Sequence, residues 1–377
     1  MANRSIGVRD GLRLVQSARG RRDRRRDTSV DEFVVGLLAP INGSAGIWGP
    51  SAIACAQLAQ VEINASGGLL ERAVRLHVID ASDEALAVGS LTADLMQAGA
   101  IDAIVGMHTS QVRERVLHDL NLQVPYIYTP LYEGGETTPG VFAIGETPQT
   151  QLRPALEHLA RRFGARRWML IGNDYVWPRV SHRYAAQYVR ELPGEVLSTH
   201  YLPVGTTDFG PVLETIRRKR PDAVLLSLIG QDAVLFNREF GASDLSRGVL
   251  RLSAAIEENG LLAIGAENTE GLFVSSGYFA ALDTEANMSF RERYYNHFGQ
   301  RVPALNALGQ SAYEGVHFMA SIVVRAAESE APFVGDLHEP LLFRSVRGTQ
   351  FLGNQRCSSP MYIAEAGGHF FRKPVVL

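Results

Sequence analysis

The segments Val105-Gly-Met-His-Thr-Ser-Gln-Val-Arg113 and Ile171-Gly-Asn-Asp-Tyr-Val-Trp-Pro-Arg179 decide the fold of this chain. In each segment an apolar run stops at a polar or aromatic loop, and a helix is expected to begin directly afterwards. The unpaired N–H groups of such a helix start lie beside short polar side chains, here those of residues 108–110. A third apolar run ends in the same way at 125–130. These strand ends predict the two walls of a cleft for a small polar ligand, with ordinary strand–helix corners as the alternative.

Outward from these segments, short apolar runs alternate with stretches of helical periodicity. This alternation predicts parallel sheets with helices on both faces, and therefore an α/β fold. The predicted strands are 33–39, 73–80, 101–105, 126–129 and 141–144, then 168–172, 196–202, 223–229, 250–255 and 271–276. The predicted helices include 51–64, 84–98, 112–121, one starting at 148, 207–218, 285–298 and 307–327.

The strand count restarts near residue 147, which predicts two doubly wound parallel-sheet domains. Beyond residue 283 come two long helices, followed by short runs at 361–365 and 370–372 that resemble hairpin strands. Such strands need a sheet edge, so we expect the chain to cross between the domains more than once and to form a hinge. The expected ligand-binding lobe 1 is 32–146 plus about 280–335, and lobe 2 is 147–279 plus about 336–377.

The bulk composition excludes several classes of protein. The chain has 377 residues, a net charge of −3 and no apolar run of membrane-spanning length. Residues 1–31 hold an arginine-rich stretch that we expect to be a disordered tail without a signal-peptide pattern, which predicts a cytoplasmic location. Contact of this tail with nucleic acid is a weaker alternative. Cys55 and Cys357 fit no metal-binding spacing, and Cys55 lies in an apolar run typical of a buried thiol.

No set of residues in the sequence assembles into an active site. The glycine-rich loop 40–50 lacks both the dinucleotide-binding and the phosphate-binding glycine patterns. Ser110 has His108 two residues away, but no third group is available to orient such a pair. His108 also lacks a second histidine or cysteine at ligand spacing. We therefore predict a protein that is not an enzyme and uses no metal or other cofactor.

Several motifs resemble the type I periplasmic-binding-protein fold of the leucine/isoleucine/valine-binding class. The general resemblance lies in the runs at 33–40, 63–69 and 104–106. More specific pieces resemble the branch that holds urea-uptake binding proteins and the cytoplasmic amide sensor of the aliphatic amidase operon. These pieces are 110–113, 128–134, 172–179 and 203–209, together with 257–259, 264–267 and 283–286. The resemblance covers about residues 32–330.

The resemblance implies a set of ligand-binding residues, carried over position by position. Ser110 falls where the family's serine hydrogen-bonds the ligand, and His108 falls on a neighbouring wall. Tyr175 and Trp177 match the aromatic pair with which the second domain closes over the ligand. The remaining positions that the resemblance implies are Tyr128 and Thr129 on the first-domain wall, and Glu257 or Glu258 on the opposite side.

The resemblance also implies two roles for the same cleft. The first is a sensor for a small neutral amide that regulates amidase or nitrile-metabolism genes through a nucleic-acid-binding antiterminator or transcription factor, with no membrane contact. The alternative is the substrate-binding component of an ABC importer for urea, short amides or branched-chain amino acids. Either role is compatible with a homodimer.

Overall fold

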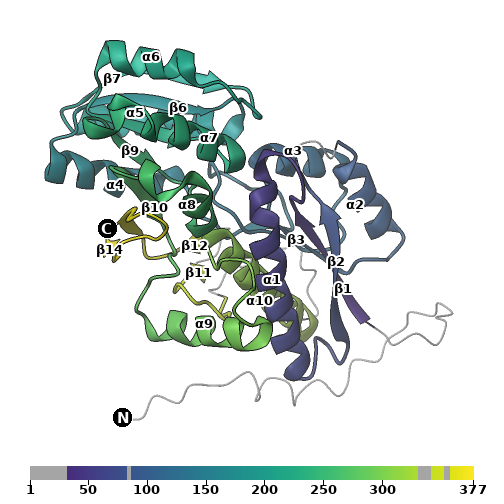
Figure 1. Cartoon of the computed structure of the whole chain (residues 1–377). Coiled ribbons are helices and arrows are strands. Elements are labelled where there is room, and N and C mark those ends of the chain that lie inside the picture. The colour runs from purple at the N-terminus through teal and green to yellow at the C-terminus, as the bar shows by residue number, and fades with distance from the viewer. Residues whose placement is uncertain (1–31, 83–85, 330–340, 352–356) are drawn as a thin grey trace.

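The computed structural model describes residues 32–82, 86–329, 341–351 and 357–377. Two large β-sheets, each covered by helices, divide this part of the chain into two lobes that lie against each other (Figure 1). The predicted tail 1–31 lies outside the described residues, as does the predicted start of the helix at 84. The predicted α/β class with parallel-sheet domains is confirmed.

Lobe 1 is built on a five-stranded parallel sheet of order β2-β1-β3-β4-β5. The interior strand β1 is buried along nearly its whole length, as expected for a strand that is apolar after Glu32 and covered on both faces. The long helix α10 (Ala307–Ser329) packs against α1, β3 and β4. The strands are β1 (Glu32–Ala39), β2 (Ala73–Asp80), β3 (Ala103–Gly106), β4 (Tyr126–Tyr128) and β5 (Val141–Ala143). The other helices are α1 (Gly49–Ala65), α2 (Val88–Gln97), α3 (Ser110–Asp119) and α9 (Glu285–Phe298).

Lobe 2 is built on a seven-stranded sheet of order β14-β13-β10-β9-β8-β6-β7, in which β13 and β14 run antiparallel to their neighbours. Its strands are β6 (Arg167–Asn173), β7 (Glu195–Leu202), β8 (Ala223–Ser227), β9 (Leu250–Ser253), β10 (Leu272–Ser276), β13 (Tyr362–Glu365) and β14 (Val375–Val376). Its helices are α4 (Pro148–Phe163), α5 (Val176–Glu191), α6 (Gly210–Lys219), α7 (Gly230–Gly241) and α8 (Glu258–Ile264), with 3-10 turns η3 (Asp244–Arg247) and η4 (Ala266–Asn268).

The chain passes between the two lobes more than once, as the sequence predicts. Within the described residues the passages run from β5 to α4, from β10 to α9, and from the small β11–β12 pair to β13. The paired strands are β11 (Gln350–Phe351) and β12 (Cys357–Ser358). Several passages side by side form a hinge rather than a flexible linker.

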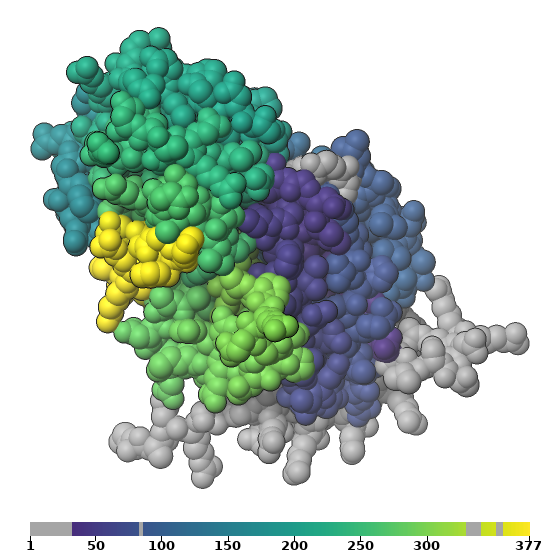
Figure 2. Space-filling view, viewed as in Figure 1, coloured from purple at the N-terminus to yellow at the C-terminus, as the bar shows by residue number. Residues whose placement is uncertain are grey.

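The lobes are also in contact with each other away from the hinge. The turn η2 (Ser44–Trp48), which follows β1 in lobe 1, packs against α7 of lobe 2. Figure 2 shows the purple residues from the start of lobe 1 directly against the teal and green surface of lobe 2. The structure is therefore a closed form in which the carboxyl ends of both parallel sheets meet.

Two local predictions are wrong in detail. The strand that pairs with β13 is Val375–Val376, whereas the predicted run 370–372 supplies only the isolated bridge of Phe371 with Ala366. The aromatic side chain of Phe371 instead packs on Phe279, which explains its apolar character. Helix α6 begins at Gly210 and not at residue 207 as predicted, and the carboxylate of Asp208 just before it accepts a hydrogen bond of 2.9 Å from the Gly210 backbone N–H. Cys55 is buried within α1, as expected.

Candidate functional site

The loops at the carboxyl ends of the strands meet between the lobes, where parallel sheets commonly bind their ligands. Trp48 follows β1 and Met107 follows β3 in lobe 1, and both belong to one packed cluster with Tyr175, Trp177 and Ile229 of lobe 2. Trp177 and Tyr175 are only 4% and 8% exposed, and their ring centroids lie 6.2 Å apart. The structure thus brings the predicted aromatic pair of lobe 2 to lobe 1.

His108 is held inside lobe 1 by its own neighbours. Its Nδ1 lies 3.1 Å from the carbonyl oxygen of Thr109, and its Nε2 lies 2.8 Å from the hydroxyl of Tyr126. A carbonyl only accepts, so Nδ1 carries the proton and the Tyr126 hydroxyl donates to Nε2. Burial, reinforced by the charge of Arg113, lowers the pKa of His108 to about 4. The imidazole is therefore neutral at pH 7, with both ring nitrogens engaged by protein groups.

Ser110 and Tyr128 lie together, whereas Thr129 does not join them. Ser110 is the first residue of α3, and its Oγ lies 3.5 Å from the Tyr128 hydroxyl. That hydroxyl donates a hydrogen bond of 2.8 Å to the carbonyl of His108. The Thr129 hydroxyl instead donates to the carbonyl of Gly106, and its methyl group faces the backbone of Gly315 in α10. Thr129 therefore packs the interior of lobe 1.

Arg113 is a site-supporting residue to which the sequence analysis assigned no role. Its guanidinium carbon lies 4.9 Å from the ring centroid of Tyr128 and 5.4 Å from that of Tyr132. Glu133 and Glu136 form ion pairs with the same guanidinium, which is nearly fully buried. A cation between two ring faces fixes their orientation, so Arg113 holds Tyr128 in place behind Ser110. The presence of an arginine and two glutamates within otherwise apolar motifs was the available signal.

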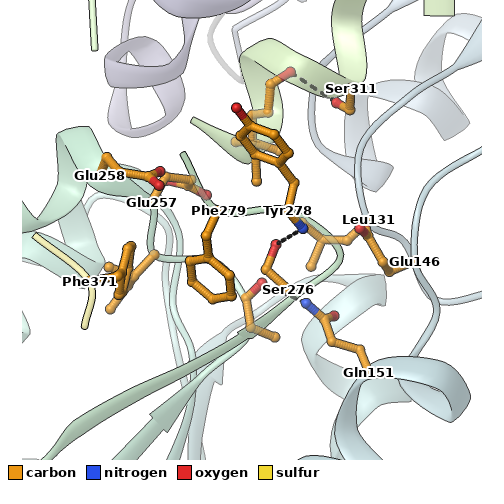
Figure 3. A pocket seen from close by; sticks show the side chains of 14 residues that line it. Leu131, Glu146, Gln151, Glu257, Glu258, Ser276, Tyr278, Phe279, Ser311 and Phe371 are labelled. Atoms are coloured by element: carbon orange, nitrogen blue, oxygen red, sulfur yellow. Dashed lines mark hydrogen bonds between the residues drawn. The ribbon is translucent and has the colours of Figure 1, made fainter. Parts of the chain in front are cut away.

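Glu257 lines the contact between the lobes from the lobe 2 side. It is the N-cap of α8, is 5% exposed, and borders a cavity of about 10 Å³ together with Glu258. Figure 3 shows both glutamates on one side of this cavity, with Gln151 and Glu146 on the other. A volume of this size holds about one water molecule. A ligand as large as an amide or amino acid therefore enters only after the lobes separate.

The electrostatics of this contact are unfavourable for a carboxylate. Burial, together with the neighbouring charge of Glu258, raises the pKa of Glu257 to about 8, and burial raises that of Glu258 to about 7. The indole N–H of Trp48 is close enough to lower the pKa of Glu257 in part. Yet Trp48 Nε1 makes no well-directed hydrogen bond within the described part of the chain. The buried indole N–H of Trp48 in lobe 1 and the buried carboxyl group of Glu257 in lobe 2 thus lie near each other, and each can still take part in a hydrogen bond with a ligand.

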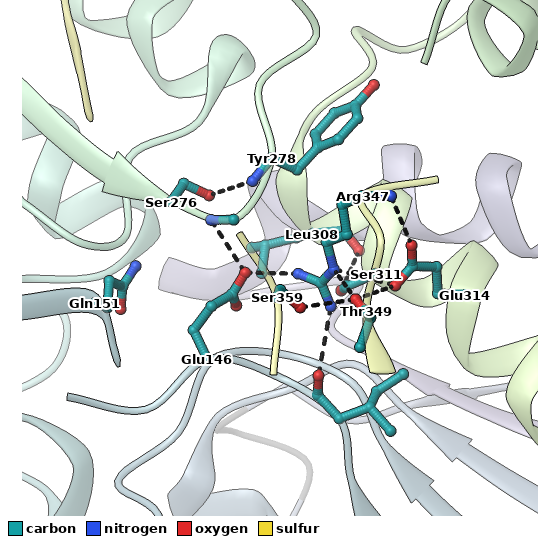
Figure 4. A network of polar contacts seen from close by, with 12 residues as sticks. Glu146, Gln151, Ser276, Tyr278, Leu308, Ser311, Glu314, Arg347, Thr349 and Ser359 are labelled. Carbon is teal, nitrogen blue, oxygen red and sulfur yellow. Dashed lines mark hydrogen bonds and ion pairs between the residues drawn. The ribbon is translucent and has the colours of Figure 1, made fainter. Parts of the chain in front are cut away.

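A buried ionic network lies at the hinge beneath the cavity. Arg347 Nη1 donates to Glu146 at 2.6 Å, and its Nε donates to Glu314 of α10 at 3.1 Å. The Arg347 side chain is 1% exposed and that of Glu314 0%. Figure 4 shows Thr349 joining Glu314 to Ser359, at 2.9 Å and 2.8 Å respectively.

The same network connects every described passage between the lobes. Glu146 lies in the first passage and also accepts a hydrogen bond of 3.2 Å from the backbone N–H of Gly277 in the second. Ser359 lies in the third. A Cβ at Gly277 would lie 2.3 Å from the Glu146 carboxylate, so any other residue there would displace this carboxylate from its position beside Arg347. Burial opposes the charge on Glu314, but Arg347 and hydrogen bonds from Ser345 and the backbone keep its pKa below the usual value.

None of the described helices combines the length and apolarity that a membrane crossing needs. Across the described ranges, His, Cys, Asp and Glu side chains do not gather in groups of three or more that could hold a metal ion.

A family model and several solved structures match nearly the whole described part of the chain. A family model described as a periplasmic binding protein matches residues 32–369. The chain is similar to the branched-chain amino acid transporter substrate binding protein LivJ from Streptococcus pneumoniae in complex with isoleucine. Identity is 19% over 92% of this chain and 99% of that chain, with a TM-score of 0.76.

Two further solved structures are similar over nearly their whole length. One is a solute binding protein of an ABC transporter from Rhodopseudomonas palustris HaA2 in complex with p-hydroxybenzoic acid. Identity is 18% over 92% of this chain and 96% of that one, with a TM-score of 0.78. The other is an amino acid ABC transporter substrate-binding protein from Pseudomonas fluorescens Pf-5. Here identity is 16% over 92% and 95% of the chains, with a TM-score of 0.76. At these identities the likeness is one of fold.

Replacing Arg347 with methionine should strongly destabilise the protein. The substitution leaves Glu314 and Glu146 as buried carboxylates without their cation, and such a loss lowers the free energy of unfolding by about 3–5 kcal/mol. Urea denaturation followed by circular dichroism measures the change. The control is Arg217→Ala, which removes an exposed pair with Glu214 and Asp244 and should leave the free energy of unfolding nearly unchanged. Equal effects of the two substitutions would contradict a structural role of the network.

Replacing Glu257 with glutamine should change the pH dependence of stability. The pKa of Glu257 is about 8 in the folded state against an ordinary value of 4.5, so the folded state binds more protons between these values. The contribution of Glu257 to stability is therefore greatest below pH 4.5 and falls as the pH rises towards 8. Glutamine removes this loss. The free energy of unfolding of Glu257→Gln, measured relative to that of the parent, should therefore rise by on the order of 1–3 kcal/mol as the pH is raised from 5 to 8.

Urea denaturation at pH 5, 6.5 and 8 tests this expectation. Glu292→Gln, an exposed position of α9, is the matched control and should shift stability equally at every pH. A difference between Glu257→Gln and the parent that stays constant from pH 5 to 8 would show that Glu257 is not held in a desolvated site.

Proposed function

The chain belongs to the periplasmic binding protein family, and we propose that it serves as the substrate-binding component of an ABC importer. It is a ligand-binding protein of the type I class, as the sequence motifs predicted. The proposed cargo is urea, a short amide or a branched-chain amino acid. The single observation that carries this proposal is the buried pair of Glu257 and Trp48, one from each lobe, at the point where the strand ends meet.

The chemistry of the proposed site favours a ligand with an oxygen acceptor and a nitrogen donor. Trp48 Nε1 offers a donor, and the start of α3 at Ser110 adds a hydroxyl beside the positive end of a helix. Glu257 accepts from an amide N–H or pairs with an ammonium group. Tyr175 and Trp177 exclude water and limit ligand size. Amides, urea and amino acids all present this combination of groups.

A second candidate function is the cytoplasmic amide sensor that regulates amidase or nitrile-metabolism genes. The observation in its favour is the pair of distinctive motifs at 128–134 and 172–179, which resemble the amide sensor of the aliphatic amidase operon. Such a sensor acts through a partner protein that binds its open and closed forms with different affinities. Cell fractionation separates the two candidates, because a receptor for import is exported whereas the sensor stays in the cytoplasm.

We predict that Ser110→Ala and Tyr175→Ala each weaken ligand binding by about ten-fold or more, since each removes a contact from a desolvated site. Isothermal titration calorimetry and thermal-shift titration with acetamide, urea and leucine measure the effect. Ser90→Ala, at an exposed position of α2, is the control and should bind as the parent does. Parent-like affinity in both site variants would place the ligand elsewhere.

Proton counting should separate the two ligand classes. An ammonium group favours the ionised form of Glu257, whereas a neutral amide leaves this buried group protonated near pH 7. Binding of acetamide should therefore leave the complex with up to about one proton more than binding of leucine. Calorimetry in buffers of different ionisation enthalpy gives this number. The difference should vanish in Glu257→Gln, and a difference that persists in that variant would assign it to another group.

A further inference from the structure

The turn η2 reaches from lobe 1 onto the helix starts of lobe 2. Ser44 Oγ donates a hydrogen bond of 2.8 Å to Asp232 Oδ1 in the first turn of α7. Three residues further on, the carbonyl of Ile47 accepts a hydrogen bond of 2.8 Å from Asn259 Nδ2 at the start of α8. Both bonds join the two lobes, and both involve only protein atoms.

The backbone of η2 lies unusually close to lobe 2 at the same place. Gly230, the first residue of α7, has a positive φ of 47°, and a Cβ built on it would lie 1.8 Å from the carbonyl oxygen of Ser44. No side chain could occupy that space while the lobes are closed. Gly230 therefore permits a direct backbone-to-backbone approach between the lobes.

Residues of lobe 2 alone fix the position of the Asp232 carboxylate that Ser44 contacts. Its carboxylate accepts from Asn173 Nδ2 at 2.6 Å and from the backbone N–H of Gly205 at 2.9 Å, and the residue is 1% exposed. Asn173 is fixed in turn, since its Oδ1 accepts from the backbone N–H of Ile229. When the lobes separate, Asp232 keeps its lobe 2 donors and loses only Ser44. Removing the Ser44 hydroxyl therefore leaves no buried charge without a partner.

From these contacts we propose that Ser44 and Asp232, with Gly230 and Asn259, form a latch that holds the cleft closed without ligand and thereby sets its affinity. These are positioning residues, because they act on the equilibrium between open and closed forms. The closed form has room for about one water molecule, so a ligand binds the open form. The apparent dissociation constant of a ligand scales inversely with the fraction of protein in that open form, and the latch therefore weakens binding. The part of the proposal that concerns affinity rests on the proposed function, whereas the part that concerns closure does not.

Tryptophan quenching tests the closure in the ligand-free protein. All three tryptophans belong to one packed cluster, in which Trp48 of lobe 1 meets Trp177 of lobe 2, while Trp168 is buried within the sheet of lobe 2 on β6. The expected result is that Ser44→Ala raises the acrylamide quenching constant about two-fold and shifts emission to the red, with an unchanged urea unfolding midpoint. Ser90→Ala should leave quenching unchanged. Asn259→Ala is a second, independent latch variant and should also raise it.

Unchanged quenching in both Ser44→Ala and Asn259→Ala would overturn the latch. The affinity is then measured with whichever of acetamide, urea or leucine raises the melting temperature of the parent. Because it increases the fraction of open protein, Ser44→Ala should lower the dissociation constant of that probe about ten-fold. Raised quenching with parent-like affinity would overturn the affinity-setting role. Absence of binding by all three probes to the parent would count against the proposed function and leave the quenching result as the test of the latch.

Discussion

The buried contact of Arg347 with Glu146 and Glu314 is the constraint on which the rest of the structure depends. It lies where the chain passes between the lobes, and its members reach all of the described passages through Gly277 and Ser359. A charge buried this deeply is tolerated only with its partners in place. The passages therefore move together, and the lobes have one hinge geometry instead of many.

The polar groups at the contact between the lobes are paired less completely than those at the hinge. At the hinge each buried charge has a partner of opposite sign, whereas at the contact between the lobes Glu257 and Glu258 lie side by side and the indole N–H of Trp48 has no well-directed partner within the described residues. Such unsatisfied groups lower stability and are typical of sites that complete their hydrogen bonds with a ligand. The closed form is held by Ser44, Asp232 and Asn259 in spite of this disadvantage.

The predicted site residues of lobe 1 differ in what their side chains contact. Ser110 stands at the start of α3 with its hydroxyl beside that of Tyr128, whereas His108 has both ring nitrogens engaged and Thr129 faces α10. Tyr128 connects the two groups, because its hydroxyl contacts Ser110 and the carbonyl of His108 while its ring rests on Arg113. In the proposed site the motif would supply one group for the ligand, Ser110, and several that orient it, an arrangement that makes a binding geometry rigid.

The sequence by itself determined the α/β class, the succession of strands and helices, and the strand ends at which a ligand site should lie. These features follow from local periodicity and from the rule that parallel sheets bind at their carboxyl ends. Only the tertiary structure decided which polar groups meet, because Ser44 and Asp232 are 188 residues apart in the chain and Arg347 and Glu146 are 201 apart. It also decided that Val375–Val376 pairs with β13. Contacts of that kind depend on how the lobes pack, and no local pattern of residues encodes them.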